Sequence, residues 1–341
     1  MGEHKYAQLA DSLRASIKDG TYGDGQKLPS ENELAAKTGY SRQTVRQAMS
    51  LLEAEGLTQR VQGSGTYVRS RKVQREQTHN IAVVTTYIGE YIFPAILMGI
   101  DGVLAKNGYT PLLSATRNRV DTERRVLTEL LKKPIDGLIL EGTKTALPNP
   151  NIDLYDEFER QGIPVVFING FYPDVKNPLY VVANDHDGGR IACEALIKQG
   201  CKRVAGIFKS DDMQGHRRYA GYADALRAAK ISVDDDKVMW YTTENRDSLL
   251  QSCALDVLKG CDAALCYNDE VALKVINLLS YSGLPEIAVA SFDNSTLAQI
   301  SATPFLSLSS PKEAIGSIAA EKLLNIINGK QEQSTVLPWS V

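Results

Sequence analysis

The sequence of 341 residues lacks the long apolar segments of membrane-inserted and exported chains. It has no run of 18 apolar residues and no apolar stretch near its N-terminus that resembles a signal peptide. We therefore expect neither membrane insertion nor secretion, and predict a cytoplasmic protein. The length exceeds that of one ordinary domain, so two or three domains are expected.

Residues for metal, redox and catalytic chemistry are also sparse. The five cysteines include no CxxC pair, and none of the four histidines lies at metal-ligand spacing from them or forms a catalytic group. There is no GxxxxGK[ST] loop, and Gly63-Ser64-Gly65 precedes Tyr-Val rather than a helix, which excludes a dinucleotide loop. We therefore predict no metal, no cofactor and no enzymatic activity, and interpret the cysteines as buried thiols.

The net charge of −3 offers little for a nucleic-acid partner, but the charges are unevenly distributed. Residues 1–76 hold 12 Lys and Arg against 9 Asp and Glu, whereas the remainder holds 26 against 32. A basic front joined to an acidic remainder suits a DNA-binding domain with a ligand-sensing body. Chance asymmetry of a few charges would give the same numbers, so this observation is only supporting.

The segment 41–52 has the clearest pattern. Its apolar residues Val45, Ala48, Met49 and Leu52 recur at helical spacing, and Ser41 suits the N-cap. The opposite face is polar and carries Arg42, Gln43, Arg46, Gln47 and Ser50. Arginine and glutamine pair bidentately with guanine and adenine in the major groove, although an isolated helix of this kind is more often simply solvated.

The flanking segments favour the DNA-binding interpretation. Ser30 and Glu33 form a capping box for a preceding short helix, which Gly39 ends. Two helices joined by about three residues have helix-turn-helix spacing. After Gly56, two short strands at 57–61 and 66–68 flank a glycine-containing turn, so a hairpin wing is expected.

Residues 5–69 resemble the winged-helix domain of GntR-type bacterial repressors. The motifs that carry this resemblance are LPSE, SRQTVR, the EGL step and GSGTYV. In that family the second helix of the turn enters the major groove and the wing tip touches the minor groove. The resemblance implies DNA contacts from Lys5, Glu31, Arg42, Gln43, Thr44, Arg46, Gln62 and Gly63. Glu31 would accept from a cytosine amino group or orient an arginine.

After residue 70, polar and basic residues dominate up to residue 80, and we interpret 71–80 as a linker. From Ile81 onward apolar runs alternate with helical patterns, which predicts parallel sheets covered by helices. About ten such units are too many for one sheet, so two lobes with a ligand cleft between them are expected. The predicted strands are Ile81–Thr85, Pro111–Leu113, Gly137–Leu140, Val165–Ile168, Val181–Ala183, Val204–Phe208, Val238–Tyr241, Ala263–Cys266 and Ile287–Ala290.

Residues 81–330 resemble the sugar-sensing core of LacI/GalR repressors, which is related to periplasmic sugar-binding proteins. The resemblance rests on PIDGLILEG (134–142), QGIPVVFING (161–170), the segment 182–207, RRYAGYADAL (217–226), LCYNDEVALKVINLL (265–279) and ASFDNS (290–295). A GntR-type reader joined to a LacI-type sensor is similar to the arabinose-operon repressors of Bacillus-like bacteria, as are TTYIGEYIFP (85–94) and FKSDDMQG (208–215). This resemblance implies operator DNA, a homodimer formed by the sensor, and L-arabinose as effector.

Effector-binding candidates follow from the same resemblance. Arg218 matches the arginine that grips sugar hydroxyls, Asn268 the asparagine of NDxxA, and Asp293 a ligand-binding aspartate. Asn169 replaces an aspartate of the family, and Ser310 replaces a glutamine or aspartate, which weakens that assignment.

Four further candidates lie at strand ends of the first lobe: Tyr91, Arg117, Glu141 and Lys144. Other interpretations stay open. Asn268 would also cap the following helix, Asp293 would also suit a turn, and Glu141 and Lys144 would also form a surface pair.

The sequence therefore predicts an α/β protein with an N-terminal winged helix-turn-helix (1–70), a linker (71–80) and a two-lobed, periplasmic-binding-protein-like parallel-sheet sensor (81–341). We assign about 81–182 and 311–330 to the first lobe, and about 183–310 and 331–341 to the second. The family continues past the last helix with a strand and an Arg-x-Ser-like tail, so Leu337-Pro-Trp-Ser-Val341 indicates a shorter last strand of the second lobe or a shortened sequence.

The predicted function is a sugar-responsive transcriptional repressor that controls sugar-utilisation genes. The alternatives are an activator or dual regulator that senses another pentose or hexose, and a sugar-binding protein without a regulatory role.

Overall fold

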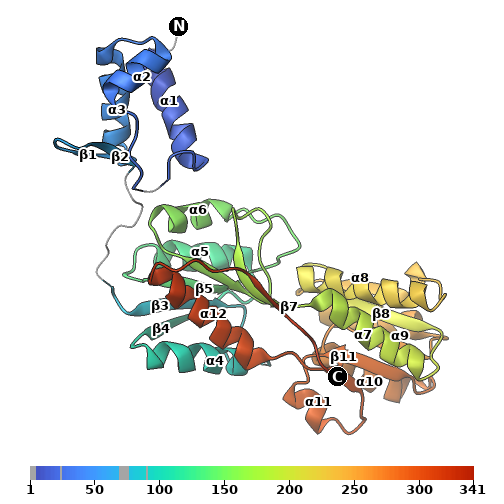
Figure 1. The fold of residues 1–341 in the computed structure, drawn as a ribbon. Helices are drawn as coiled ribbons and strands as arrows, with labels where there is room; N and C mark the ends of the chain where they lie inside the picture. Colours follow the sequence, from blue (N-terminus) through green and yellow to red (C-terminus); the bar gives the residue numbers. More distant parts are fainter. Residues whose placement is uncertain (1–4, 24, 69–76, 90) are drawn as a thin grey trace. The chain divides into compact units, whose positions relative to one another are not determined.

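The computed structural model describes residues 5–23, 25–68, 77–89 and 91–341, and the chain divides into two units, 1–76 and 77–341 (Figure 1). Each unit has its own apolar core. The predicted linker falls mainly outside the described residues. Its last residues, however, belong to the second unit, because the N–H groups of Thr78 and His79 donate to the Asp136 carboxylate at 2.8–3.0 Å. For these residues the linker prediction is wrong.

The first unit contains α1 (Lys5–Lys18), α2 (Glu31–Thr38) and α3 (Arg42–Ala54). The expected capping box is present, since the Ser30 hydroxyl accepts from the Glu33 N–H and the Glu33 carboxylate accepts from the Ser30 N–H. Gly39 ends α2 in the left-handed conformation, and the Ser41 hydroxyl caps α3. These short-range signals fix the helix-turn-helix spacing.

The apolar face of α3 forms the centre of this unit. Val45, Ala48, Met49 and Leu52 are all buried, as the helical spacing predicted, and pack with Leu9 and Leu13 of α1. The wing is an antiparallel hairpin of β1 (Thr58–Val61) and β2 (Gly65–Val68), in which Thr58 pairs with Val68. Gly63 turns the chain between them with φ 77°, a conformation that glycine adopts without strain.

The first lobe of the second unit has a six-stranded parallel sheet in the order β13-β7-β6-β5-β3-β4. Helices α4 and α12 cover one face of this sheet, and α5 and α6 cover the other (Figure 1). The strands are β3 (Asn80–Thr85), β4 (Thr110–Ala115), β5 (Gly137–Glu141), β6 (Val165–Ile168), β7 (Leu179–Ala183) and β13 (Thr335–Leu337). The helices are α4 (Phe93–Lys106), α5 (Val120–Leu130), α6 (Ile152–Arg160) and α12 (Lys312–Ile327).

The second lobe has a five-stranded parallel sheet in the order β12-β11-β10-β8-β9. Helices α7 and α8 pack on one face, and α9 and α10 on the other. The strands are β8 (Val204–Lys209), β9 (Val238–Tyr241), β10 (Ala263–Cys266), β11 (Ala288–Phe292) and β12 (Leu306–Leu308). The helices are α7 (Asp185–Lys198), α8 (Met213–Ala228), α9 (Arg246–Leu258), α10 (Asp269–Ser282) and α11 (Thr296–Ile300), with a 3-10 turn at Asp235–Lys237.

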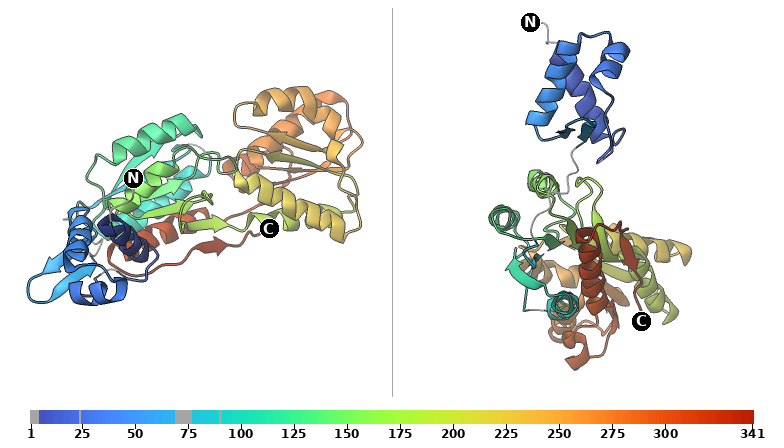
Figure 2. Two further views of the ribbon diagram at one scale, coloured as in Figure 1. Left: turned by 90° about the horizontal axis from the view of Figure 1, so that it is seen from above. Right: turned by 60° about the vertical axis from the view of Figure 1, so that its left-hand side comes forward.

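All nine predicted strands are present, so the alternation of apolar runs and helical patterns identified the parallel sheets correctly. The assignment of 331–341 to the second lobe is wrong for β13, because Thr335–Leu337 pairs with Val181–Ala183 at the edge of the first-lobe sheet. Beyond β13 the chain crosses to the second lobe, where Ser340 pairs with Ser309. The views of Figure 2 show this crossing of the C-terminal segment (red).

Among the described residues, no helix is both long and apolar enough to cross a membrane.

Candidate functional site: an interlobe cleft and an exposed helix

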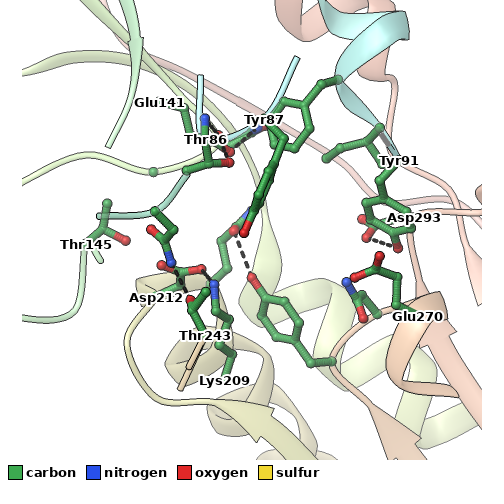
Figure 3. A pocket seen from close by; sticks show the side chains of 18 of the residues that line it. Thr86, Tyr87, Tyr91, Glu141, Thr145, Lys209, Asp212, Thr243, Glu270 and Asp293 are labelled. Carbon is green, nitrogen blue, oxygen red and sulfur yellow. Dashed lines mark hydrogen bonds and ion pairs between the residues drawn. The ribbon is translucent and has the colours of Figure 1, made fainter. Parts of the chain in front are cut away.

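A cavity of about 210 Å³ lies between the two lobes of the second unit. Its walls are the carboxyl ends of the parallel strands and the loops that follow them, where ligands bind in open α/β sheets. Side chains from both lobes point into it (Figure 3). The first lobe contributes Thr86, Tyr87, Tyr91, Ile92, Phe93, Asn118, Glu141, Gly142, Thr145, Asn169 and Gly170. The second contributes Lys209, Asp212, Gln214, Arg218, Tyr241, Thr243, Arg246, Tyr267, Asn268, Glu270 and Asp293.

Arg218 of α8 is the most constrained side chain of the cavity, with only 2 % of its surface exposed. Its Nε donates to Asp185 at 2.9 Å and its Nη1 to the carbonyl oxygen of Tyr267 at 2.5 Å. Burial disfavours the charge, but Asp185 and Asp293 outweigh it and raise the pKa of Arg218. The guanidinium is therefore charged and fixed, and neither bond uses Nη2, which can donate to a ligand.

Glu141 lies at the end of β5 and is buried in the first-lobe wall. Its carboxylate accepts from Asn169 Nδ2 at 2.8 Å and from the N–H of Thr86 at 2.8 Å. Burial raises the pKa of Glu141, and these hydrogen bonds oppose the shift. The three residues form one polar group that offers acceptors and donors to the cavity.

Asp293, which follows β11, connects the two lobes. Its Oδ2 accepts from the Tyr91 hydroxyl at 2.5 Å (Figure 3). That hydroxyl accepts in turn from the N–H of Asp269 at 3.2 Å. Burial raises the pKa of Asp293 to about 6, with Arg218 and Tyr91 opposing the shift. Both Tyr91 (φ 58°) and Asp293 (φ 96°) hold left-handed backbone conformations. Strained positions of this kind concentrate at ligand-binding sites.

Each cation of the cavity is paired with a carboxylate. Lys209 Nζ lies 2.5 Å from Asp212 Oδ2, and Arg246 Nη1 lies 2.8 Å from Glu270 Oε2. Burial works against the charge of Lys209, but Asp212 and Asp211 outweigh it and raise its pKa. With Arg218 held by Asp185, the cavity has no uncompensated positive charge among its lining residues.

The first unit presents the polar face of α3 to solvent. Arg42, Gln43 and Arg46 are exposed, and Thr44 is half-buried at the N-terminus of the helix. Glu31 binds Arg46 Nη2 at 2.9 Å and Arg60 Nη2 at 2.9 Å, so it holds one arginine of the helix and one of the hairpin side by side. The hydrogen bond from Arg46 is the main cause that lowers the pKa of Glu31.

Comparison with known proteins assigns both units. Residues 5–68 match the model of bacterial regulatory proteins of the gntR family, and residues 193–340 match that of the periplasmic binding protein-like domain. The arabinose metabolism transcriptional repressor of Halalkalibacterium halodurans is 34% identical, over 97% of this chain and 91% of that protein. That of Geobacillus stearothermophilus is 37% identical, over 95% of this chain and 91% of that protein.

The chain belongs to the family of the arabinose metabolism transcriptional repressors. This is a family of sugar-responsive repressors, so the chain is a transcription regulator and not an enzyme. Among solved structures, the transcription regulator CcpA of Lactococcus lactis superimposes with a TM-score of 0.67 at 23% identity. The match covers 78% of this chain and 97% of that one, and it shows the shared fold of the sensor.

For this family member, the structure brings six of the nine predicted effector residues to the cavity: Tyr91, Glu141, Asn169, Arg218, Asn268 and Asp293. Asn268 also caps α10, since its Oδ1 accepts from the N–H of Val271 at 3.1 Å. The two interpretations of Asn268 are thus compatible. Glu141 and Lys144 do not form a surface pair, because Glu141 is buried against Thr86 and Asn169.

Three predicted effector residues do not line the cavity of this repressor. Arg117 is exposed, and its neighbour Asn118 lines the wall instead. Lys144 binds Glu244 of the second lobe across the cleft, and its neighbour Thr145 lines the wall. Ser310 lies in the crossover before α12 and is not among the lining residues. Arg117, Lys144 and Ser310 therefore lie outside the set of lining residues, and their effector-binding role stays a prediction.

The sequence interpretation missed several cavity residues of this repressor, most of which follow strands. Thr86 and Tyr87 come after β3, Thr243 after β9 and Tyr267 after β10. A search for polar and aromatic residues directly after each predicted strand would have found them. Lys209 and Asp212 belong to FKSDDMQG (208–215), the segment that resembles the arabinose-operon repressors.

The predicted DNA contacts of this repressor lie on α1, the start of α2, α3 and the wing. Gln62 and Gly63 are exposed in the turn of the hairpin, and the exposed Lys5 places its Nζ 5.9 Å from the ring centre of Tyr40. Arg60 was not predicted, although it is exposed on β1 and shares Glu31 with Arg46. Its position two residues before Gln62, near the end of the predicted wing strand, was the available signal. The eight DNA contacts implied by the resemblance stay predictions.

Proposed function

We propose that this chain represses transcription by binding a two-fold symmetric operator as a homodimer and releases it when an uncharged monosaccharide, L-arabinose first among the candidates, occupies the interlobe cavity. The observation that carries the proposal is the cavity itself. It combines fixed planar groups (Arg218, Asn169, Asn268) with aromatic faces (Tyr87, Tyr267). Planar donors and acceptors that bind two hydroxyls each, beside an aromatic ring, suit a sugar.

The charges of the cavity support an uncharged ligand. Arg218, Arg246 and Lys209 each already hold a carboxylate, and Glu141 and Asp293 add further acids to the wall. A phosphate or carboxylate on the ligand would have to break one of these pairs or approach the acids without compensation. We therefore expect sugar phosphates and uronic acids to bind poorly.

The size of the cavity and the family support a monosaccharide. About 210 Å³ is below the roughly 300–1,000 Å³ of pockets for drug-sized ligands, which favours a monosaccharide over a larger sugar. Two relatives at 34% and 37% identity are named as repressors of arabinose metabolism. This makes L-arabinose the first sugar to test.

The exposed face of α3 supports the DNA half of the proposal. Arg42, Gln43 and Arg46 present the groups that read guanine and adenine edges, and Glu31 orients Arg46. A dimer places two such helices on two half-sites, and the half-sites then have two-fold symmetry.

Titration calorimetry of the full chain tests the ligand. We expect saturable binding of L-arabinose, weaker binding of other neutral pentoses and hexoses, and none of arabinose 5-phosphate or galacturonate. A matched variant, Arg217→Ala, changes an arginine next to Arg218 that does not line the cavity, and should bind like the wild type. Binding of the phosphate or the uronate in preference to every neutral sugar would overturn the proposed ligand class.

A further inference from the structure

The C-terminal segment reaches the back of the ligand cavity. Trp339 follows β13 and is 6 % exposed in the core of the second lobe, between α7 and β11. It does not line the cavity, so it cannot contact a ligand directly. Its indole instead lies against Arg218, whose guanidinium carbon is 5.0 Å from the centre of the ring.

Trp339 is one of three aromatic rings around this guanidinium. Phe292 and Tyr267 lie at 4.3 and 4.8 Å, and Asp185 holds Nε. An arginine held by stacked rings keeps one orientation, and desolvation strengthens cation–π attraction. The site of the indole is also shaped for it, because a Cβ on Gly188 of α7 would lie 2.6 Å from Trp339 Cδ1.

The indole is attached to the other lobe. Strand β13, which pairs with β7 in the first-lobe sheet, ends at Leu337, two residues before Trp339. Directly after Trp339, Ser340 exchanges backbone hydrogen bonds of 2.8 and 2.9 Å with Ser309. Trp339 is therefore held between a first-lobe strand and a second-lobe crossover. Its position depends on both lobes.

We propose that Trp339 is a positioning residue for the ligand-binding Arg218: it holds the guanidinium in the orientation that grips the sugar, through the C-terminal segment that joins the two lobes. This inference rests on the proposed sugar-binding function. The ring–guanidinium stack predicts that loss of the indole weakens sugar binding by roughly 3- to 30-fold, the range that corresponds to a partly or fully desolvated cation–π contact.

The test measures affinity for L-arabinose by titration calorimetry on the full chain. Trp339→Leu should bind roughly 3- to 30-fold more weakly, whereas Trp339→Phe, which keeps an aromatic face, should recover most of the affinity. Trp240→Phe is the matched control, because Trp240 packs against Phe208 and Tyr219 and does not line the cavity. Gly188→Ala displaces the indole without removing it, and should also weaken binding. It replaces the Leu variant if that variant does not fold.

A double-mutant cycle separates positioning from general destabilisation. In an Arg218→Lys background, Trp339→Leu should change the affinity by less than about twofold, because the group on which it acts is already lost. Sugar should also change the emission of Trp339 in the Trp240→Phe variant, which has a single tryptophan.

The outcomes are distinct. A wild-type chain that binds no neutral sugar would overturn the proposed function and this inference together. If the wild type binds sugar, two results would overturn the inference alone. One is an unchanged sugar affinity of both Trp339→Leu and Gly188→Ala. The other is a double mutant in which the affinity losses of Trp339→Leu and Arg218→Lys add fully.

Discussion

Replacing Tyr91 by phenylalanine removes one hydroxyl that joins the lobes. The Tyr91 hydroxyl donates to Asp293 Oδ2 at 2.5 Å and accepts from the N–H of Asp269 at 3.2 Å. Asp293 is 5 % exposed and therefore depends on its donors. Without the hydroxyl, the Asp293 carboxylate is still attracted by Arg218 but loses a hydrogen bond in the closed cleft. In the open cleft, water can replace the Tyr91 hydroxyl, so only the closed state is destabilised.

The magnitude follows from this contact. A hydrogen bond to a charged group contributes about 1.5–3 kcal/mol. A loss of about 2 kcal/mol from the closed state shifts the opening equilibrium by roughly 30-fold. Since the sugar is held by side chains of both lobes, Tyr91→Phe should raise its Kd by up to that factor.

Titration calorimetry measures the change in Kd, and hydrogen exchange separates it from a lost sugar contact. Without sugar, the Asp269 N–H should exchange faster in Tyr91→Phe than in the wild type, because its acceptor is gone and the cleft opens more often. Tyr281→Phe is the matched control, since Tyr281 is 91 % exposed on α10. Unchanged exchange and unchanged affinity in Tyr91→Phe would refute the closing role of this hydrogen bond.

Three further predictions concern DNA, pH and the linker. Arg42→Ala and Arg46→Ala should each weaken operator binding by about 1–3 kcal/mol in gel-shift titrations, and equal losses on random DNA would show phosphate contacts only. Because burial raises the pKa of Asp293 from 3.8 to about 6, its contribution to the free energy of unfolding is present at low pH and lost as pH rises through 6. Between pH 5 and 7 the free energy of unfolding, measured by urea titration, should therefore fall by about 1 kcal/mol more in the wild type than in Asp293→Asn. Parallel pH profiles of the two proteins would contradict this. Inserting about ten Gly and Ser residues in 71–76 should blunt induction more than DNA binding, and full release by sugar would argue against coupling through dimer geometry.

Local sequence signals predicted the first unit and the sheets well. The capping box at Ser30, the left-handed Gly39 and the apolar spacing of α3 depend on a few neighbouring residues. The parallel strands are buried on both faces and appear as apolar runs. The short strand β12 was not predicted, and β13 was expected only as a shortened strand of the second lobe. Three residues each carry almost no pattern, and their pairing is set by distant strands.

The sequence identified the loops that line the cavity, but not always the residue of each loop that does so. Arg117, Asn118 and Lys144 all have φ near +50°, a conformation that residues other than glycine rarely adopt. Such a residue redirects the chain, so the neighbours Asn118 and Thr145 line the cavity while Arg117 and Lys144 do not. No local sequence signal predicts these left-handed conformations. It depends on tertiary contacts such as the bond from the Lys144 N–H to Asn118 Oδ1 at 3.0 Å.

The central claim is that sugar in the interlobe cavity releases DNA from the first unit, and reciprocal coupling tests it most directly. An operator is first selected by the full chain from a random duplex pool, and its Kd is measured by fluorescence anisotropy with and without saturating L-arabinose. We expect sugar to weaken operator binding by about 5- to 150-fold, and operator to weaken sugar binding by the same factor. The Arg218→Ala variant should keep the operator affinity and lose the sugar effect. An operator Kd that stays the same at saturating sugar would contradict the account.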